Sequence, residues 1–122
     1  MNYEIKISEH KHPVPYVVFE DKAYDLLGEF LLAERSFRRE ILSVTNDVDL
    51  GISEKESFAG NAFTLELTKD TCKITCDSDN RELEVGTKDF KAVLLDYIYA
   101  LRETKVKEKM ASLKHDHEHH HH

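Results

Sequence analysis

The sequence has no long apolar run, little glycine and proline, and only two cysteines. No stretch approaches the roughly 20 apolar residues that a membrane-spanning helix needs. Residues 1–7 also lack the basic and then apolar pattern of a secretory signal peptide. From these absences we expect a cytoplasmic protein that does not associate with a membrane.

The two cysteines, Cys72 and Cys76, lie four residues apart in a segment with strand periodicity. At ~3.3 Å per residue their Cα atoms would be about 13 Å apart. A disulfide needs Cα atoms within about 7 Å, so an intrachain disulfide is excluded there. We expect two buried thiols in a reducing compartment, because a thiolate metal site would need closer spacing and further ligands.

The motifs of common catalytic and cofactor sites are missing. There is no Walker loop, no dinucleotide glycine fingerprint, no His-Glu-x-x-His and no Cys-x-x-Cys. Asp47-Val-Asp49 and Asp77-Ser-Asp79 lack the glycine and the glutamate of a calcium loop. Gly60-Asn61 is the one glycine motif of interest, and at the start of a strand it predicts a bulge or turn with left-handed backbone angles. We expect no cofactor and no metal.

An enzyme is not expected, because no nucleophile lies beside a base. The histidines outside the C-terminal run, His10 and His12, flank a proline loop, where a metal site is the alternative interpretation. A pair of carboxylates acting as general acid and base has no spacing rule, and that alternative stays open.

Charge narrows the kinds of partner. The 122 residues carry 17 basic and 24 acidic side chains, a net charge of −7. The histidine-rich residues 115–122 resemble an expression tag, which leaves residues 1–114 as one predicted domain. Without the two acidic residues of that tag, the balance is 17 to 22, a net charge of −5. An acidic surface repels phosphate backbones and attracts basic partners, so we expect no direct binding of nucleic acid.

The N-terminal half predicts a hairpin and two helices. Tyr3, Ile5 and Ile7 alternate with polar residues, and residues 15–20 resume as an edge strand after a proline loop. Helical spacing follows over residues 21–31 and 37–48, with Asp21 as an N-cap. One bent helix is the alternative to two. Residues 46–56 interrupt the helical period and predict an acidic hinge.

The C-terminal half predicts an antiparallel β-meander followed by a helix. Alternating apolar residues mark strands near 63–67, 72–76 and 83–85, with polar turns at 68–71 and 77–81. Thr87 is a predicted N-cap, and one apolar face continues to Leu101. Beyond Thr104 the tail is charged and is expected to fray or project. A one-sided sheet and amphipathic helices predict an α+β fold, an antiparallel β-meander with helices packed on one face.

Residues 57–101 resemble a known family. The segment Ala59-Gly-Asn-Ala-Phe-Thr-Leu-Glu-Leu67, the hairpin at Asp70-Thr71 and the Thr87-Lys-Asp-Phe90 start of the last helix are similar to small immunity proteins of bacterial polymorphic-toxin and contact-dependent growth inhibition systems. The resemblance implies a cytoplasmic inhibitor that binds a cognate toxin domain, often a basic nuclease, and blocks its active site or substrate access.

Acidic residues are the candidate partner-binding groups, because they can steer a basic partner and place carboxylates where it expects phosphate. The hinge contributes Asp47, Asp49, Glu54 and Glu56, and a second patch contains Asp77 and Asp79. Ordinary solvated loop charge is the alternative for both. Two other functions stay open: a dimeric chaperone for a secreted effector, and a small enzyme or metal-binding domain.

Overall fold

The structure is a computed structural model that describes the backbone of residues 1–119 and the side chains of residues 1–113. Within these residues the chain forms three α-helices and two antiparallel sheets, one of two strands and one of four. The predicted α+β fold is confirmed. The predicted tag, residues 115–122, is described only in part. The backbone of residues 115–119 continues the last helix, whereas their side chains and residues 120–122 lie outside the described part.

The N-terminal hairpin forms as predicted, with β1 at Tyr3–Ile7 and β2 at Pro15–Phe19. Tyr3 pairs with Phe19 and Ile7 pairs with Pro15, so the proline loop closes the hairpin at one end. Alternate residues of β2 are buried, and Val17 and Phe19 belong to the core. The hairpin therefore anchors the chain start on the helices.

Two helices follow, α1 at Asp25–Ala33 and α2 at Arg38–Asp49, joined by a 3-10 turn at Arg35–Phe37. Asp21 accepts a hydrogen bond from the Ala23 amide (2.9 Å), so it caps the 3-10 turn Lys22–Tyr24 and not α1 itself. The predicted hinge is wrong at both ends. Its first residues complete α2 because Val48 is fully buried, and its last two begin a strand.

The main sheet has four strands in meander order: β3 at Lys55–Ala59, β4 at Phe63–Thr68, β5 at Thr71–Cys76 and β6 at Glu82–Gly86. The strand β3 was missed, because only Phe58 on it is a large apolar residue. It forms by pairing with β4, and only Glu56 and Phe58 on it are half-buried. Buried residues of β4 to β6 all face the helices, which we call the inner face of the sheet.

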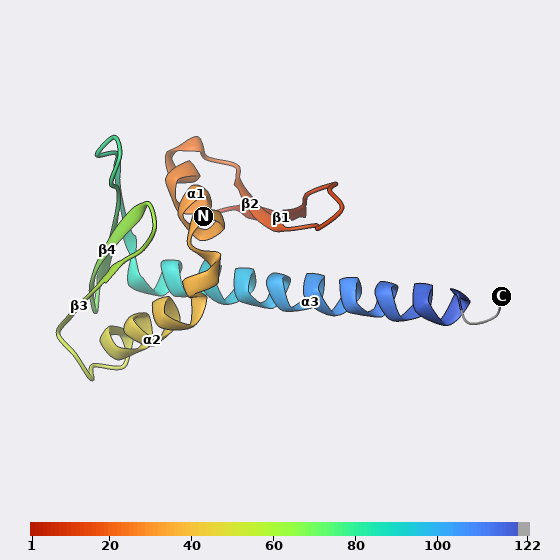
Figure 1. Ribbon diagram of the computed structural model, residues 1–122. Helices are drawn as coiled ribbons and strands as arrows, with labels where there is room; N and C mark the ends of the chain where they lie inside the picture. Colours follow the sequence, from red (N-terminus) through yellow and green to blue (C-terminus); the bar gives the residue numbers. More distant parts are fainter. Residues whose placement is uncertain (120–122) are drawn as a thin grey trace.

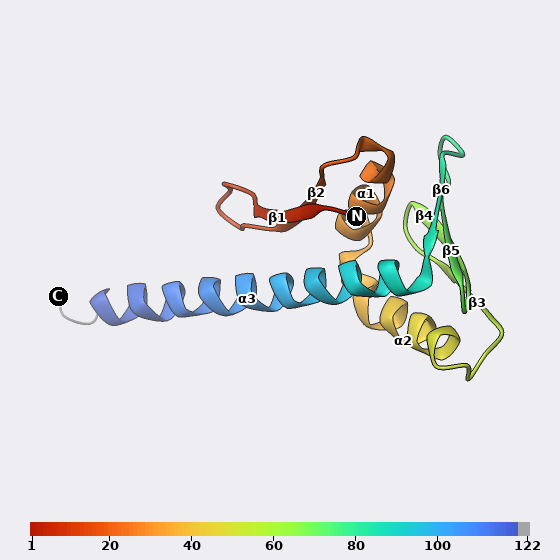
Figure 2. The same cartoon turned by 180° about the vertical axis from the view of Figure 1, so that it is seen from behind.

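The last helix, α3, runs from Thr87 to His119 and is far longer than its apolar face predicted. At 1.5 Å per residue its 33 residues extend about 50 Å. Figures 1 and 2 show its first turns against the sheet and α2, and the remainder projecting beyond the body. Thr87 is not a free N-cap: its hydroxyl donates to the Thr68 carbonyl oxygen (2.7 Å) and ties the start of α3 to the β4–β5 turn.

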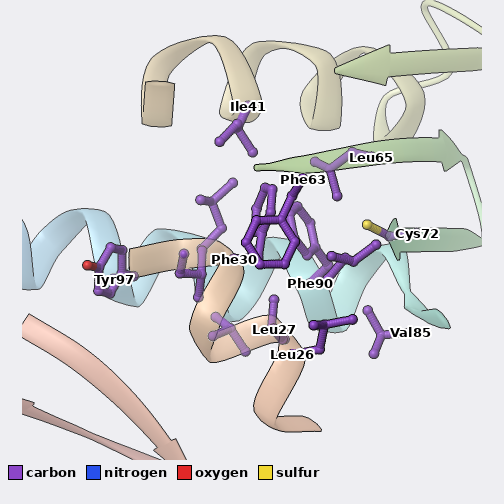
Figure 3. Close-up of a cluster of buried hydrophobic side chains, with 14 of the residues drawn as sticks. Leu26, Leu27, Phe30, Ile41, Phe63, Leu65, Cys72, Val85, Phe90 and Tyr97 are labelled. Atoms are coloured by element: carbon purple, nitrogen blue, oxygen red, sulfur yellow. The ribbon is translucent and has the colours of Figure 1, made fainter. Parts of the chain in front are cut away.

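One core joins these layers. The Phe30 ring lies between those of Phe63 and Phe90, with centroids 5.8 Å and 6.0 Å away, so α1, β4 and α3 meet at one aromatic cluster (Figure 3). Further along α3, the buried Tyr97 hydroxyl donates to the Pro15 carbonyl oxygen (2.8 Å). That bond secures the hairpin to the helix, and burial raises the pKa of Tyr97 to about 12.

Candidate interaction surfaces

The predicted acidic hinge is dispersed in the structure. Asp47 lies in the last turn of α2, where its carbonyl oxygen accepts hydrogen bonds from the amides of Ile52 (2.8 Å) and Ser53 (3.0 Å). Glu54 is exposed in the short connection to β3. Glu56 is half-buried, and it shares the inner face of the sheet with its cross-strand partner Leu67. These carboxylates do not form one surface.

Asp49 has a structural partner. Lys91 of α3 places its Nζ 2.8 Å from Asp49 Oδ2, and the two side chains are only 23% and 13% exposed for Lys91 and Asp49, respectively. The hydrogen bond from Lys91 lowers the pKa of Asp49, and the ammonium charge adds to that effect. An acidic residue at a helix C-terminus is unfavourable to the helix dipole, and the lysine compensates it. The pair joins α2 to α3 and leaves little free charge for a partner.

The second acidic patch is also tied to the fold. Asp77 accepts a hydrogen bond from the Thr64 hydroxyl (2.9 Å). Asp79 accepts from the backbone amide of Arg81 (3.1 Å) and from its guanidinium Nε (2.6 Å), and these two bonds lower the pKa of Asp79. The same guanidinium binds both carboxylate oxygens of Glu29 on α1. Arg81 therefore clamps the β5–β6 turn to α1.

The two predicted patches lie at opposite ends of the sheet. Lys55, where the hinge enters β3, pairs with Thr68 beside the β4–β5 turn. Asp77 follows Cys76, which pairs with Phe63 at the other end of β4. Figure 1 shows the hinge near α2 and the β5–β6 turn at the far edge of the sheet. The hinge residues and the second patch therefore belong to two separate parts of the surface.

Sequence reasoning missed the outer face of the sheet, which points away from the helices. Glu66, Lys73 and Glu84 form a row of cross-strand neighbours on this face, and Glu82 lies beside them with its carboxylate 3.4 Å from the lysine. The three glutamates are exposed, and the positions between them are mostly threonine. Within the described residues no helix or strand covers this face (Figures 1 and 2). In the sequence, the polar residues that alternate with the apolar ones along each strand could have indicated this face.

A buried carboxylate at Glu34 explains Gly60-Asn61. Glu34 is completely buried and accepts hydrogen bonds from the backbone amides of Asn61 (2.8 Å), Ala62 (3.2 Å) and Phe63 (3.1 Å). Neither Gly60 nor Asn61 has a positive backbone φ, so the predicted left-handed turn is wrong. Glycine is needed because the carboxylate occupies the space of a side chain at Gly60. With three amide donors satisfied, this acid holds a loop in place.

Two grooves flank α3 beyond the core. One, of about 840 Å³, lies between the hairpin and α3, where the Tyr3 hydroxyl donates to Asp96. Burial, and then this hydrogen bond, raise the pKa of Tyr3 to about 12. At the hairpin tip, His12 Nδ1 lies 3.0 Å from Glu108 Oε1. The other groove, of about 910 Å³, lies between α2 and α3 and has basic rims.

Comparisons of this chain with protein-family models, with curated proteins and with solved structures gave no match. In the part of the chain that the structure describes, no three His, Cys, Asp or Glu side chains come together as metal ligands. No helix in that part combines the length and apolar composition needed to cross a bilayer. Cys72 and Cys76 are buried free thiols, as predicted.

Proposed function

We propose that this protein is a cytoplasmic immunity protein that binds a cognate toxin domain, a basic nuclease, and neutralises it by blocking the nuclease active site. The observation that carries the proposal is the uncovered outer face of the β3–β6 sheet. It presents Glu66, Glu82 and Glu84 together with two bases, Lys73 and, at the start of β3, Lys55. Such a face is complementary to a surface built to bind phosphates.

This assignment moves the docking surface away from the predicted hinge. Asp49 and Asp79 are engaged by Lys91 and Arg81, so reversing their charge would disturb the fold as well as any partner contact. Glu66 and Glu84 have no ion pair with another described side chain, and Glu82 pairs only with Lys73 on the same face. Asp77, at the edge of that face beside Thr64, extends the acidic surface.

The test is co-expression with the toxin-like domain encoded by the neighbouring gene. We expect growth rescue, co-purification in a stoichiometric complex and no turnover by the isolated protein. Association should slow at least tenfold in Glu66→Lys/Glu84→Lys and with added salt, because exposed charges act mainly through steering. Glu9→Lys/Glu103→Lys makes the same charge change away from the sheet and should associate like the wild type.

The dimeric chaperone for a secreted effector is the second candidate. It is favoured by the exposed apolar side chains on α3, namely Tyr99 beside the hairpin and Val106, Met110 and Leu113 on the projecting part. A chaperone holds an extended client on such residues. Failure of rescue together with co-purification of a secreted effector would replace the immunity proposal by this one. Rescue with unchanged association of the sheet variant would instead refute only the outer-face assignment.

A further inference from the structure

The groove between α2 and α3 has an apolar floor. It is lined by Leu42 of α2 and by four apolar residues of α3, namely Ile98, Leu101, Val106 and Leu113. Val106 is 52% exposed and Leu113 is 60% exposed. The described part of the chain therefore leaves two apolar side chains of the groove uncovered, two helical turns apart on α3.

The rims of this groove are basic in a protein that is acidic as a whole. Five cations line it, Arg38, Arg39, Arg102, Lys105 and Lys109, against one carboxylate, Glu108. That carboxylate pairs with His12 of the hairpin loop. None of the five cations has a salt bridge with another described residue. Among the described side chains, the charge that lines the groove is thus positive, opposite to the net charge of −7.

We propose that this groove binds an acidic amphipathic helix of a partner protein. The apolar floor runs from Ile98 to Leu113, about 22 Å along α3, which accommodates roughly four turns of a second helix. Apolar side chains of the incoming helix would cover those of the groove, and its carboxylates would meet the cations that lie between and beside them. Charge complementarity of this kind selects an acidic partner and speeds its association.

Other occupants fit the groove less well. Nucleic acid would use the cations but would leave the apolar floor exposed to water, because its backbone is charged. A second copy of this chain that docks groove to groove would bring the same cations together, and like charges at an interface cost several kcal/mol. The part of α3 that lines this groove lies away from the sheet (Figure 2), and the inference does not depend on the proposed toxin.

The probe for this site is a fluorescein-labelled 18-residue helix of leucine, alanine and glutamate, with leucines at helical spacing. Its counterpart carries lysine at every glutamate position. In fluorescence anisotropy we expect the acidic peptide to bind at least tenfold tighter than the basic one, and to weaken with salt. Equal binding of the two peptides, or no binding of the acidic one, would overturn the proposal.

Matched variants locate the site. Arg102→Glu/Lys109→Glu should weaken peptide binding at least tenfold, whereas Lys11→Glu/Lys107→Glu, on the groove beside the hairpin, should stay within twofold of the wild type. Leu113→Ser should weaken binding at least fivefold, and Met110→Ser, which does not line the groove, should not. Binding that is insensitive to the groove variants would refute the assignment.

Parallel arms use labelled single-stranded DNA and RNA, vesicles rich in phosphatidylserine, and light scattering of the protein alone. If nucleic acid or vesicles bind in a groove-dependent way and the peptide does not, the proposed helical partner is wrong and the groove binds that other ligand. A dimer disrupted by Leu113→Ser would replace it by a second copy.

Discussion

The carboxylate of Glu34 occupies the space that a side chain on Gly60 would need. A Cβ at Gly60 would stand 2.8 Å from Glu34 Oε1 and overlap Oε2. The buried acid instead receives the three amides that follow this glycine. The start of β4 is therefore fixed by a contact with the residue that ends α1.

Gly60→Ala should destabilise the protein by about 2 to 4 kcal/mol, because the methyl group forces a buried charge or the loop to move. Glu34→Gln should cost about 1 to 3 kcal/mol, since an amide cannot accept from all three donors. Urea unfolding gives both values. The decisive comparison is Gly60→Ala in a Glu34→Ala background, where the penalty should fall to well under half. An undiminished penalty would show that the clash lies elsewhere.

The adjacent leucines Leu94 and Leu95 separate the buried and exposed faces of α3. Leu94 is 1% exposed and Leu95 is 44% exposed. Leu94→Ala should lower the free energy of unfolding by about 2 to 5 kcal/mol, a large part of a typical ~5 to 15 kcal/mol. Leu95→Ala should change it by less than about 0.5 kcal/mol. Similar denaturant midpoints for the two variants would mean that α3 does not pack as described.

The pair of Asp49 and Lys91 should make stability depend on acid pH. The lysine lowers the pKa of Asp49 in the folded state. The stabilisation from this carboxylate is complete above the pKa of an unfolded aspartate, near 4. It is lost as the pH falls through the lower pKa of Asp49 in the folded protein. Denaturant titrations at pH 7, 5 and 3 should show a smaller acid loss in Asp49→Asn than in the wild type. Lys91→Gln should show the same reduced loss; a wild-type profile in Lys91→Gln would contradict the coupling.

The thiol of Cys72 should be unreactive in the folded protein. Burial raises its pKa to about 12, whereas an unfolded cysteine titrates near 8.5. Its contribution to stability is therefore complete below about pH 8.5 and declines as the pH rises toward 12. Iodoacetamide at pH 8 should modify Cys72 only in guanidinium. Tryptic cleavage after Lys73 separates Cys72 from Cys76 for mass spectrometry, and rapid native alkylation of the first peptide would refute its burial.

The projecting part of α3 should exchange its amide hydrogens quickly. Thr104 is the last buried residue among the described side chains, so later turns are held by few tertiary contacts. In hydrogen exchange, residues 107–113 should exchange several orders of magnitude faster than residues 93–97. The acidic helical peptide should slow exchange in the first segment, and its basic counterpart should not. Equal protection of both segments without peptide would show that another contact covers the tail.

The local periodicity of apolar residues in this sequence predicts most of the secondary-structure elements of the fold. The alternation of Tyr3, Ile5 and Ile7, the helical spacing in α1 and α2, and the long apolar face from Phe90 to Leu101 each predict the element that forms. The strand β3 could not be predicted in this way. It is held by pairing with β4 and by the contact of Phe58 with Phe37, and only Phe58 marks it in the sequence.

The state of each acidic side chain was decided only by the tertiary structure. The sequence determined an acidic α+β domain, because composition and periodicity are properties of short segments. Whether Asp49 is free or neutralised depends on Lys91 in another helix, and the clamp from Arg81 to Glu29 joins a turn to α1. Residues so far apart in the chain share no local pattern. Only packing, which buries Glu34 and leaves Glu66 and Glu84 exposed, separates structural charge from surface charge.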